Sequence, residues 1–563
     1  MASKSNATDT GQSTADIAQE MASKRREISI SEFFAKNRHL LGFDNKRKAL
    51  LTTVKEAVDN SLDACEESGI LPEISVEIIE ISEDHFRIIV EDNGPGIVKK
   101  QIPHVFAKLL YGSKFHKLSQ SRGQQGIGIS AAVMYAQLTT GRPAKITSRI
   151  GPKTDAHYYE LHIDTQKNEP KILQESVVEW ASEHGVKVEL DIEASYQKGD
   201  QSVDQYMKET AIVNPHVTLI YTNPKAEQVI FTRVTDALPD KPKEIKPHPY
   251  GVELGILMQM LKNTETRTLQ AFLTSEFSRV GPNTAKEICQ NSSLMPNNKP
   301  RDMGREQVEH LINGIKKTKI IAPPTDCISP IGSELLERGL KKEINAEFFA
   351  AVTRPPSVYR GNPFTVEVGI AYGGAQGADQ PANVLRFANR VPLLYEQGAC
   401  SITKSIMQTM WRSYGLNQSQ GALPVGPITI AVHIASVWVP FTSESKEAVA
   451  HYPEIIKEVK LALQEVGRKL SGYVSKKRRV GDELKKRSYI EKYIPHVAQA
   501  LKEILALKDF EERKVESMLK EMLEKHRGKI EEVAEENLEY DEEFASIGKG
   551  KKTDEMDEAE ENE

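Results

Sequence analysis

Three segments follow one another within about eighty residues, and their order constrains the fold more than any other feature of the sequence. "LLTTVKEAVDNSLDAC" (50–65) has apolar residues at helical spacing, and "HFRIIVEDNGPGI" (85–97) reads as a strand that ends in a turn. "SRGQQGIGISAAVMYAQL" (121–138) places a glycine-rich stretch before a second helix. Each pattern is common alone. Together they indicate a layered α/β domain with one site built by all three.

The predicted helix at 50–65 has a polar side. Glu56, Asn60 and Asp63 are spaced i, i+4, i+7 and lie opposite the apolar residues. A solvated helix face is the ordinary explanation of such a pattern. The same residue types also suit a phosphate ligand, because the Asn60 carbonyl oxygen can bind Mg²⁺, which binds phosphate oxygens besides. Glu56, one turn away, can orient or deprotonate an attacking water.

The predicted strand stops at an acidic residue followed by glycines. Asp92 and Asn93 can open a turn, for which Gly94 and Gly96 supply positive φ. A turn alone explains these residues, so their meaning depends on the segments to either side.

The glycine-rich stretch suits a phosphate group. Gly123, Gly126 and Gly128 precede a helix that we expect to begin near Ser130. Such glycines let backbone N–H groups approach phosphates, and a helix N-terminus favours negative charge. "GIGISA" also matches GxGxxA, but no apolar strand precedes it, and GxxxxGK[ST] is absent from the sequence. A dinucleotide-binding fingerprint and a P-loop are therefore both excluded.

Length and composition limit the class of protein. At 563 residues the chain is long enough for roughly three to five domains. No run of eighteen or more apolar residues occurs, so no membrane span or membrane partner is expected. The cysteines form no CxxC pair, which argues against zinc and disulfides and predicts a cytoplasmic location. With a net charge of −6, any DNA-binding surface would have to be a local patch.

The sequence patterns predict an α+β multidomain chain. The expected order is a tail, a mixed α/β domain, a helical domain, a domain richer in strands, charged helices and an acidic tail. We place these parts at 1–27, 28–235, 240–320, 326–470, 471–545 and 546–563.

The three ordered segments resemble the Bergerat ATP-binding fold shared by gyrase, histidine kinases, heat-shock chaperones and mismatch-repair ATPases. In that family the residue matching Asp92 accepts a hydrogen bond from the adenine amino group. The resemblance therefore implies that Asp92 reads the base, while Gly94 and Gly96 let the chain turn tightly beside it.

Further segments make the resemblance more specific. "EFFAKNRHLLGFDN", "YGSKFH", "RGQQGIGI", "PPTDCISPIG", "RFANRVPLLY" and "VPFTSESKEAVA" together are similar to the B subunits of archaeal-type DNA topoisomerase VI. The likeness runs from about residue 28 to about residue 540. It implies a helix–two-turn–helix module at 240–320, a transducer at 326–470 and a stalk beyond it. It also implies that the extra C-terminal domain of some relatives is absent.

The same resemblance implies a set of site residues. Glu56 would be the general base, Asn60 the Mg²⁺ ligand, and Lys446 a transducer lysine that reaches the γ-phosphate. The implied ATP-binding residues are Asn60, Asp63, Asp92, Gly94, Gly96, Ser113, Lys114, Arg122, Gly123, Gln124, Gln125, Gly126, Ile127, Gly128, Ile129 and Lys446.

The implied function is that of an ATP-operated clamp with ATP and Mg²⁺ as cofactors. ATP would join two B subunits, and hydrolysis would drive passage of one DNA duplex through a break in another. No DxD carboxylate pair of the kind that holds Mg²⁺ in the family's cleavage domain is identified, so strand cleavage is assigned to the topoisomerase VI A subunit in an A₂B₂ assembly near the nucleoid. A chaperone or mismatch-repair ATPase and a non-enzymatic DNA scaffold are the alternatives.

Overall fold

The computed structural model describes residues 14–25, 27–114, 117–123, 126–505 and 508–527. The chain divides into two compact units. Unit 1 consists of Met1–Ala378, Ala382–Gln408 and Pro427–Leu463, and unit 2 of Asp379–Pro381, Thr409–Gly426 and Gln464–Glu563. Mixed helices and sheets confirm the α+β prediction.

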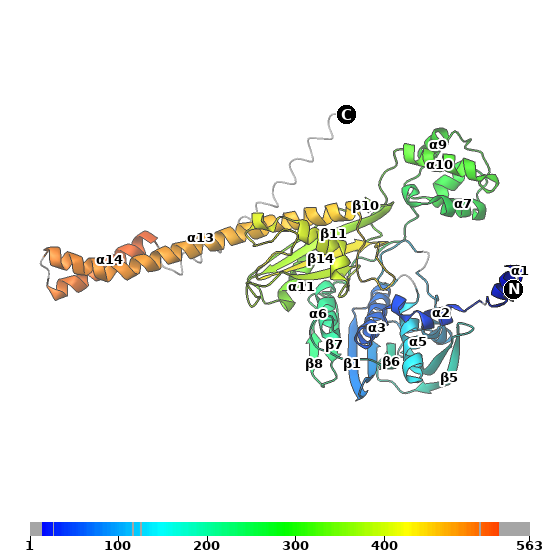
Figure 1. Ribbon diagram of the computed structural model, residues 1–563, viewed down its shortest axis with the longest axis horizontal. Coiled ribbons are helices and arrows are strands. Elements are labelled where there is room, and N and C mark those ends of the chain that lie inside the picture. Colours follow the sequence, from blue (N-terminus) through cyan, green and yellow to red (C-terminus); the bar gives the residue numbers. More distant parts are fainter. Residues whose placement is uncertain (1–13, 26, 115–116, 124–125, 506–507, 528–563) are drawn as a thin grey trace, which may run out of the picture. The chain divides into compact units, whose positions relative to one another are not determined.

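An eight-stranded sheet forms the N-terminal part of unit 1 (Figure 1). Its order is β5-β4-β3-β6-β2-β1-β7-β8, and neighbouring strands are antiparallel except for the parallel pair β1 and β7. The strands are β1 (Glu73–Ser82), β2 (His85–Asp92), β3 (Ala144–Arg149), β4 (Ala156–Asp164), β5 (Glu169–Val178), β6 (Gly185–Glu193), β7 (Thr218–Thr222) and β8 (Gln228–Phe231).

Helices pack against this sheet and enclose the first core. The two central ones, α3 and α5, contact each other and the strands β2 and β6 between them. Asn45 begins α3 by accepting a hydrogen bond from the backbone N–H of Lys48 at 2.8 Å, and Gly69 ends it at a φ of 75°. The helices that pack in this part are α2 (Ile30–Lys36), η1 (Arg38–Leu41), α3 (Lys46–Ser68), η2 (Lys99–Gln101), α4 (Ile102–Ala107), α5 (Gly128–Thr140) and α6 (Val203–Val213), and α1 (Thr14–Ser23) precedes them in the chain.

Strand β2 directs an acid into the layer between sheet and helices. Successive side chains of a strand alternate between faces, and Phe86, Ile88 and Val90 are buried on one face of β2. Asp92 is the next residue on that face, so its carboxylate enters the same apolar layer. The strand therefore delivers one charged group to the core side of the sheet.

The segment from 254 to 317 forms a helical group with a core of its own (Figure 1). Leu257, Phe272, Ile288 and Leu311 are buried in that core. Its helices are η3 (Pro249–Gly251), α7 (Leu254–Asn263), α8 (Leu269–Glu276), α9 (Pro282–Asn291), η4 (Pro300–Asp302) and α10 (Arg305–Lys317).

A six-stranded sheet follows in unit 1. Its order is β10-β11-β14-β12-β13, with β9 paired to β11, and α11 packs on β9 and β11. Ile212 and Val213 of α6 share a buried cluster with Leu336 and Leu340 of α11. The elements are α11 (Ser333–Glu343), β9 (Phe348–Thr353), β10 (Ser357–Tyr359), β11 (Asn362–Tyr372), β12 (Asn383–Ala388), β13 (Val391–Pro392), η5 (Gln397–Ala399), α12 (Ser401–Gln408) and β14 (Ile428–Ser436).

Unit 2 contains most of the long C-terminal helical region. The 3-10 turn η6 (Trp411–Tyr414) packs on it, because a Cβ at Gly467 would stand 2.6 Å from the Tyr414 ring. The long helices are α13 (Pro453–Leu505) and α14 (Asp509–Arg527). α13 begins before the charged helical region placed at 471–545, and residues 528–545 of that region lie outside the described residues. Across the described ranges, none of the helices combines the length and the apolar character that a membrane crossing requires.

Candidate functional site

A cavity of about 600 Å³ in unit 1 gathers most of the predicted site residues. It lies between α3, the end of β2, the start of α5 and two loops of the second sheet, near residues 392–395 and 444–447. This volume is ordinary for a small-molecule site. The predicted residues that line it are Glu56, Asn60, Asp92, Gly96, Ser113, Lys114, Gly123, Gly126, Ile127, Gly128, Ile129 and Lys446.

Asp92 is fixed at the cavity wall by three donors. The backbone N–H groups of Gly94 and Val186 donate to its Oδ1 at 2.9 and 3.2 Å, and the Ser61 hydroxyl donates to Oδ2 at 2.7 Å. Burial raises the pKa of the Asp92 carboxyl, although these hydrogen bonds oppose the shift. A carboxylate has about four lone-pair sites, so one remains for a donor inside the cavity.

The turn after Asp92 requires glycine at one position. Gly96 has a φ of 71°, and a Cβ there would overlap the Arg149 backbone carbonyl. The expectation of positive φ was wrong for Gly94, which is not among the positive-φ residues. Gly94 stands outside the cavity wall, with its N–H turned to Asp92.

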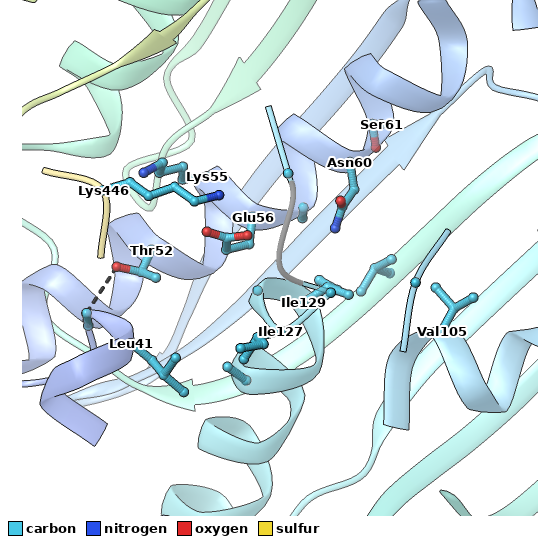
Figure 2. A pocket seen from close by; sticks show the side chains of 18 of the residues that line it. Leu41, Thr52, Lys55, Glu56, Asn60, Ser61, Val105, Ile127, Ile129 and Lys446 are labelled. Atoms are coloured by element: carbon cyan, nitrogen blue, oxygen red, sulfur yellow. Dashed lines mark hydrogen bonds between the residues drawn. The ribbon is translucent and has the colours of Figure 1, made fainter. Parts of the chain in front are cut away.

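Glu56 and Asn60 project from α3 toward the glycine-rich stretch. Figure 2 shows Glu56 on α3 and Asn60 one turn further along the same helix. A Cβ at Gly128 would overlap the Glu56 carboxylate, which explains why a glycine begins α5. The Asn60 side chain is exposed to the cavity, and its Oδ1 lies 3.8 Å from the place of a Cβ at Gly123. A carboxylate and an amide oxygen thus face the same open space.

Two lysines stand next to Glu56. Lys446 enters from the loop after β14, and its Nζ donates to the Arg122 carbonyl at 3.3 Å. Lys55 lies on α3 itself, and Figure 2 shows both lysine side chains near the Glu56 carboxylate. Burial lowers the pKa of the Lys446 ammonium, while the charge of Glu56 raises it. An anion in the cavity would stabilise the charged form of Lys446.

Three predicted residues lie behind the cavity rather than on its wall. Arg122 is buried and forms ion pairs with Asp63 at 2.8 Å and with Glu66 at 2.7 Å. Asp63 also forms an ion pair with Lys114 at 2.7 Å, so its carboxylate holds both Lys114 and Arg122. Among the described residues, Asp63, Gly94 and Arg122 are the predicted site residues that do not line the cavity. Gln124 and Gln125 lie outside the described residues.

The donor set fits a magnesium ion held mainly by phosphates. Within the described ranges, no group of three or more His, Cys, Asp or Glu residues is placed to hold a metal. Mg²⁺ usually keeps several waters and takes one or two protein oxygens plus substrate phosphates. The Asn60 Oδ1 beside the glycine-rich stretch is such an oxygen.

Sequence reasoning missed several residues of the cavity. Ser61 was not predicted, although its hydroxyl orients Asp92, and Lys55 was not predicted although it borders Glu56. Both adjoin predicted residues on α3, but neighbouring residues of a helix point about 100° apart, so the i, i+4, i+7 pattern did not include them. Leu393 to Tyr395 line the cavity from the chain just after β13. The segment RFANRVPLLY, which contains them, was used for the family resemblance but not for the site.

A buried acid beneath the cavity makes stability depend on pH. Tyr206, which lines the cavity, donates to Asp59 Oδ1 at 3.0 Å, and burial raises the pKa of Asp59 to about 7. The folded state therefore holds a proton that the unfolded state releases above the ordinary aspartate pKa of 3.8, so the Asp59 contribution to stability falls as pH rises toward 7.

We expect Asp59→Asn to remove this pH dependence. Relative to the wild type, the variant should gain stability on the order of 4 kcal/mol between about pH 4 and about pH 8. Thermal unfolding midpoints across that range check the prediction. The prediction is contradicted if the difference in unfolding midpoint between the wild type and the variant stays constant with pH.

Two protein families match separate segments of the chain, and these segments contain most of the residues that line the cavity. The pattern of the histidine kinase-, DNA gyrase B- and HSP90-like ATPases matches residues 45–166, and that of the topoisomerase VI B subunit transducer matches residues 323–486. The chain is 54% identical over 492 residues to the B subunit of type 2 DNA topoisomerase 6 from Methanococcoides burtonii, covering 87% of this chain and 79% of the relative.

A second relative and a solved structure are also similar. The corresponding B subunit from Archaeoglobus fulgidus is 50% identical over 486 residues, which covers 86% of this chain and 80% of the relative. The crystal structure of the DNA gyrase B subunit from Myxococcus xanthus has a TM-score of 0.38 and 12% identity, over 78% of this chain and 95% of that one.

Proposed function

The chain belongs to the family of type 2 DNA topoisomerase 6 B subunits, and from this premise we propose that ATP closes two copies of it into a clamp that hydrolysis reopens. The chain carries the ATPase segment of this family and its transducer. Its activity is that of the ATP-hydrolysing subunit of a type II topoisomerase.

One observation carries the proposal. Lys446 comes from the transducer segment, yet it lines the same cavity as Glu56 and Asp92 of the ATPase segment. A ligand closes a gate only if it binds the closed state more tightly than the open state. A phosphate that meets Lys446 supplies such a differential contact, because the transducer segment must be in place for the lysine to reach it.

Each wall of the cavity suits a different part of ATP. The open lone pair of Asp92 would accept a hydrogen bond from the adenine amino group. Backbone N–H groups around Gly126 and Gly128, at the start of α5, would meet the phosphates. Asn60 would hold Mg²⁺, which when bound neutralises phosphate charge.

Hydrolysis would use the two charged groups nearest the cavity's phosphate end. Glu56 would orient and deprotonate the attacking water, and Lys446 would stabilise negative charge on the γ-phosphoryl group as it passes from ADP, the leaving group, to the water oxygen. Ser113 and Lys114 would border the nucleotide, while Asp63 and Arg122 would act from behind by holding Lys114 and the glycine-rich stretch.

The remaining parts of the chain would bind partners. We assign α7 to α10 to contacts with the DNA backbone, as the helix–two-turn–helix module at 240–320. The stalk from 471 to 545 would bind the A subunit, and Tyr489, Ile490 and Tyr493 expose apolar surface on α13 for that purpose. The domain bounds predicted above, the A₂B₂ assembly and a cytoplasmic location near the nucleoid complete the proposal.

The test is relaxation of supercoiled plasmid by the full-length chain with and without the A subunit. Relaxation should require ATP and both subunits, and a non-hydrolysable ATP analogue should convert the chain alone from monomer to dimer. A chaperone or mismatch-repair ATPase would hydrolyse ATP without relaxing DNA in any mixture. A DNA scaffold would bind plasmid with neither ATP turnover nor nucleotide-dependent dimers.

A further inference from the structure

We propose that the ion pair between Lys48 and Glu447 is a latch that positions Lys446 in the nucleotide site when the transducer segment closes on the ATPase segment. This inference rests on the proposed function, because it assigns Lys446 to the γ-phosphate. Lys48 and Glu447 are positioning residues here, since they act through Lys446.

The pair joins the two family segments at short range. Lys48 Nζ lies 2.6 Å from Glu447 Oε1, and the exposed fractions of the two side chains are only 11% and 9%. Lys48 belongs to the first turn of α3, the helix that carries Glu56, whereas Glu447 follows Lys446 directly in the chain. A single contact thus fixes the loop with the lysine to the helix with the proposed base.

Lys48 is prepared for this contact on the ATPase side. Asp44, one turn earlier, holds its ammonium group at 3.0 Å. From the transducer segment, the Tyr395 ring lies 5.3 Å from the same group. Burial lowers the pKa of Lys48, but hydrogen bonds to Glu447 and Asp44 outweigh it and raise the pKa overall. Lys48 therefore stays charged in the closed arrangement.

The loop that carries Lys446 is tightly folded. Lys446 has a φ of 55°, in the left-handed region that non-glycine residues rarely adopt, and its N–H donates to the Ser443 carbonyl at 3.1 Å. The Thr442 N–H donates to the Ala448 carbonyl at 2.9 Å across the loop. Such a conformation persists only when surrounding contacts offset its cost, and the ion pair of Glu447 is one such contact.

A buried arginine supports the same loop from the transducer side. Arg386 of β12 donates to the Leu393 and Tyr395 carbonyls at 2.7 and 2.8 Å and reaches the Glu447 carbonyl at 3.5 Å. Arg386 thereby connects the backbone of Tyr395, whose ring contacts Lys48, with the backbone of Glu447. Lys48 therefore meets two residues, Tyr395 and Glu447, whose backbones are joined by hydrogen bonds to the same arginine.

The charges of Lys48 and Glu447 are suited to fixing the position of Lys446 rather than to adding much net stability. In an open arrangement both charges would be hydrated, so the attraction in the closed state is largely offset by desolvation. Removing Lys48, however, leaves the buried Glu447 carboxylate without this partner, and removing the Glu447 charge leaves the buried Lys48 ammonium with Asp44 alone. Both changes disfavour closure. Loss of the pair should therefore weaken the nucleotide-driven steps more than nucleotide binding itself.

The experiment compares Lys48→Met, Glu447→Gln and the double variant in the full-length chain. Three quantities are measured: affinity for a non-hydrolysable ATP analogue at protein concentrations below dimerisation, the analogue concentration that half-dimerises the chain, and kcat for ATP. Glu175→Gln is the matched control, because it breaks an exposed pair with Lys99 of similar length, 2.7 Å.

Each single variant should raise the half-dimerising analogue concentration and lower kcat by about tenfold, while analogue affinity changes by less than about threefold. The double variant should be no worse than either single one, Lys48→Arg should recover most of the loss, and the control should match the wild type. Thermal unfolding midpoints identify any variant that misfolds. If one single variant misfolds, the dimerisation and kcat of the other single variant test the latch.

The latch is overturned if both single variants dimerise and hydrolyse ATP as the wild type does. It is also overturned if the two losses multiply in the double variant, since independent residues behave in that way. A wild-type chain that itself neither dimerises nor turns over ATP would instead overturn the proposed function, and the latch with it.

Discussion

Glu56→Ala should reduce the rate of ATP hydrolysis by a factor on the order of 10²–10⁴, the usual contribution of a general base. The Glu56 carboxylate lies where a Cβ at Gly128 would stand, so it faces the start of α5 and the phosphate end of the cavity. Removing it takes away the group that orients the water but leaves Asp92 and Asn60 in place. The variant should therefore bind ATP and remain a closed dimer.

Phosphate release measures the rate of hydrolysis, and sedimentation in the presence of ATP shows whether the variant remains a dimer. Glu77→Ala is the control, because Glu77 is an exposed residue of β1 outside the cavity wall. Near wild-type turnover in Glu56→Ala would remove Glu56 as the base. Loss of ATP binding in the variant would show that the carboxylate supports the site rather than the reaction.

Asp92→Asn should weaken ATP binding by about tenfold to a hundredfold, the effect of losing a hydrogen bond to a charged group. The Asn oxygen could keep the donors from Gly94 and Val186. Its NH₂ group would replace the oxygen that Ser61 now contacts, and would present a donor to the adenine amino group, which is itself a donor. Two donors facing each other disfavour the complex.

Calorimetry with ATP and GTP analogues measures this effect and the base preference together. The wild type should prefer ATP, because GTP has an acceptor where adenine carries its amino group, and Asp92→Asn should reduce that preference. Glu91→Gln is the neighbouring control, since Glu91 points to the other face of β2 and contacts Ser182. Unchanged ATP affinity in Asp92→Asn would contradict base recognition by Asp92.

The elements that build the site could be read from local periodicity. The predicted helix at 50–65 lies within α3, the predicted strand ends at Asp92 with β2, and the helix expected near Ser130 begins at Gly128. Helical and strand periods are properties of neighbouring residues, so a short segment contains them in full. The resemblance to a known family supplied the assignment of Lys446, which no local pattern could have given.

Other features depended on contacts that sequence spacing does not encode. The polar side of α3 was read as one face, yet Glu56 and Asn60 line the cavity whereas Asp63 lies behind its wall. There Asp63 pairs with Arg122 and holds Lys114, which does line the cavity. Val186, which fixes Asp92, is a neighbour only because β6 pairs with β2. An ion-pair partner is chosen by packing, and packing involves residues from all parts of the chain.

The sequence by itself determined the helix with Glu56 and Asn60, the strand that ends at Asp92 and the glycines before α5, because each follows from the order of adjacent residues. The family resemblance had placed Lys446 in this site, and the tertiary structure shows how it is held there, by the Arg122 carbonyl 324 positions earlier in the chain. Only the tertiary structure decided that Lys48 meets Glu447 beside it. Burial in a shared core brings such residues together, and burial is a property of the folded chain rather than of any segment.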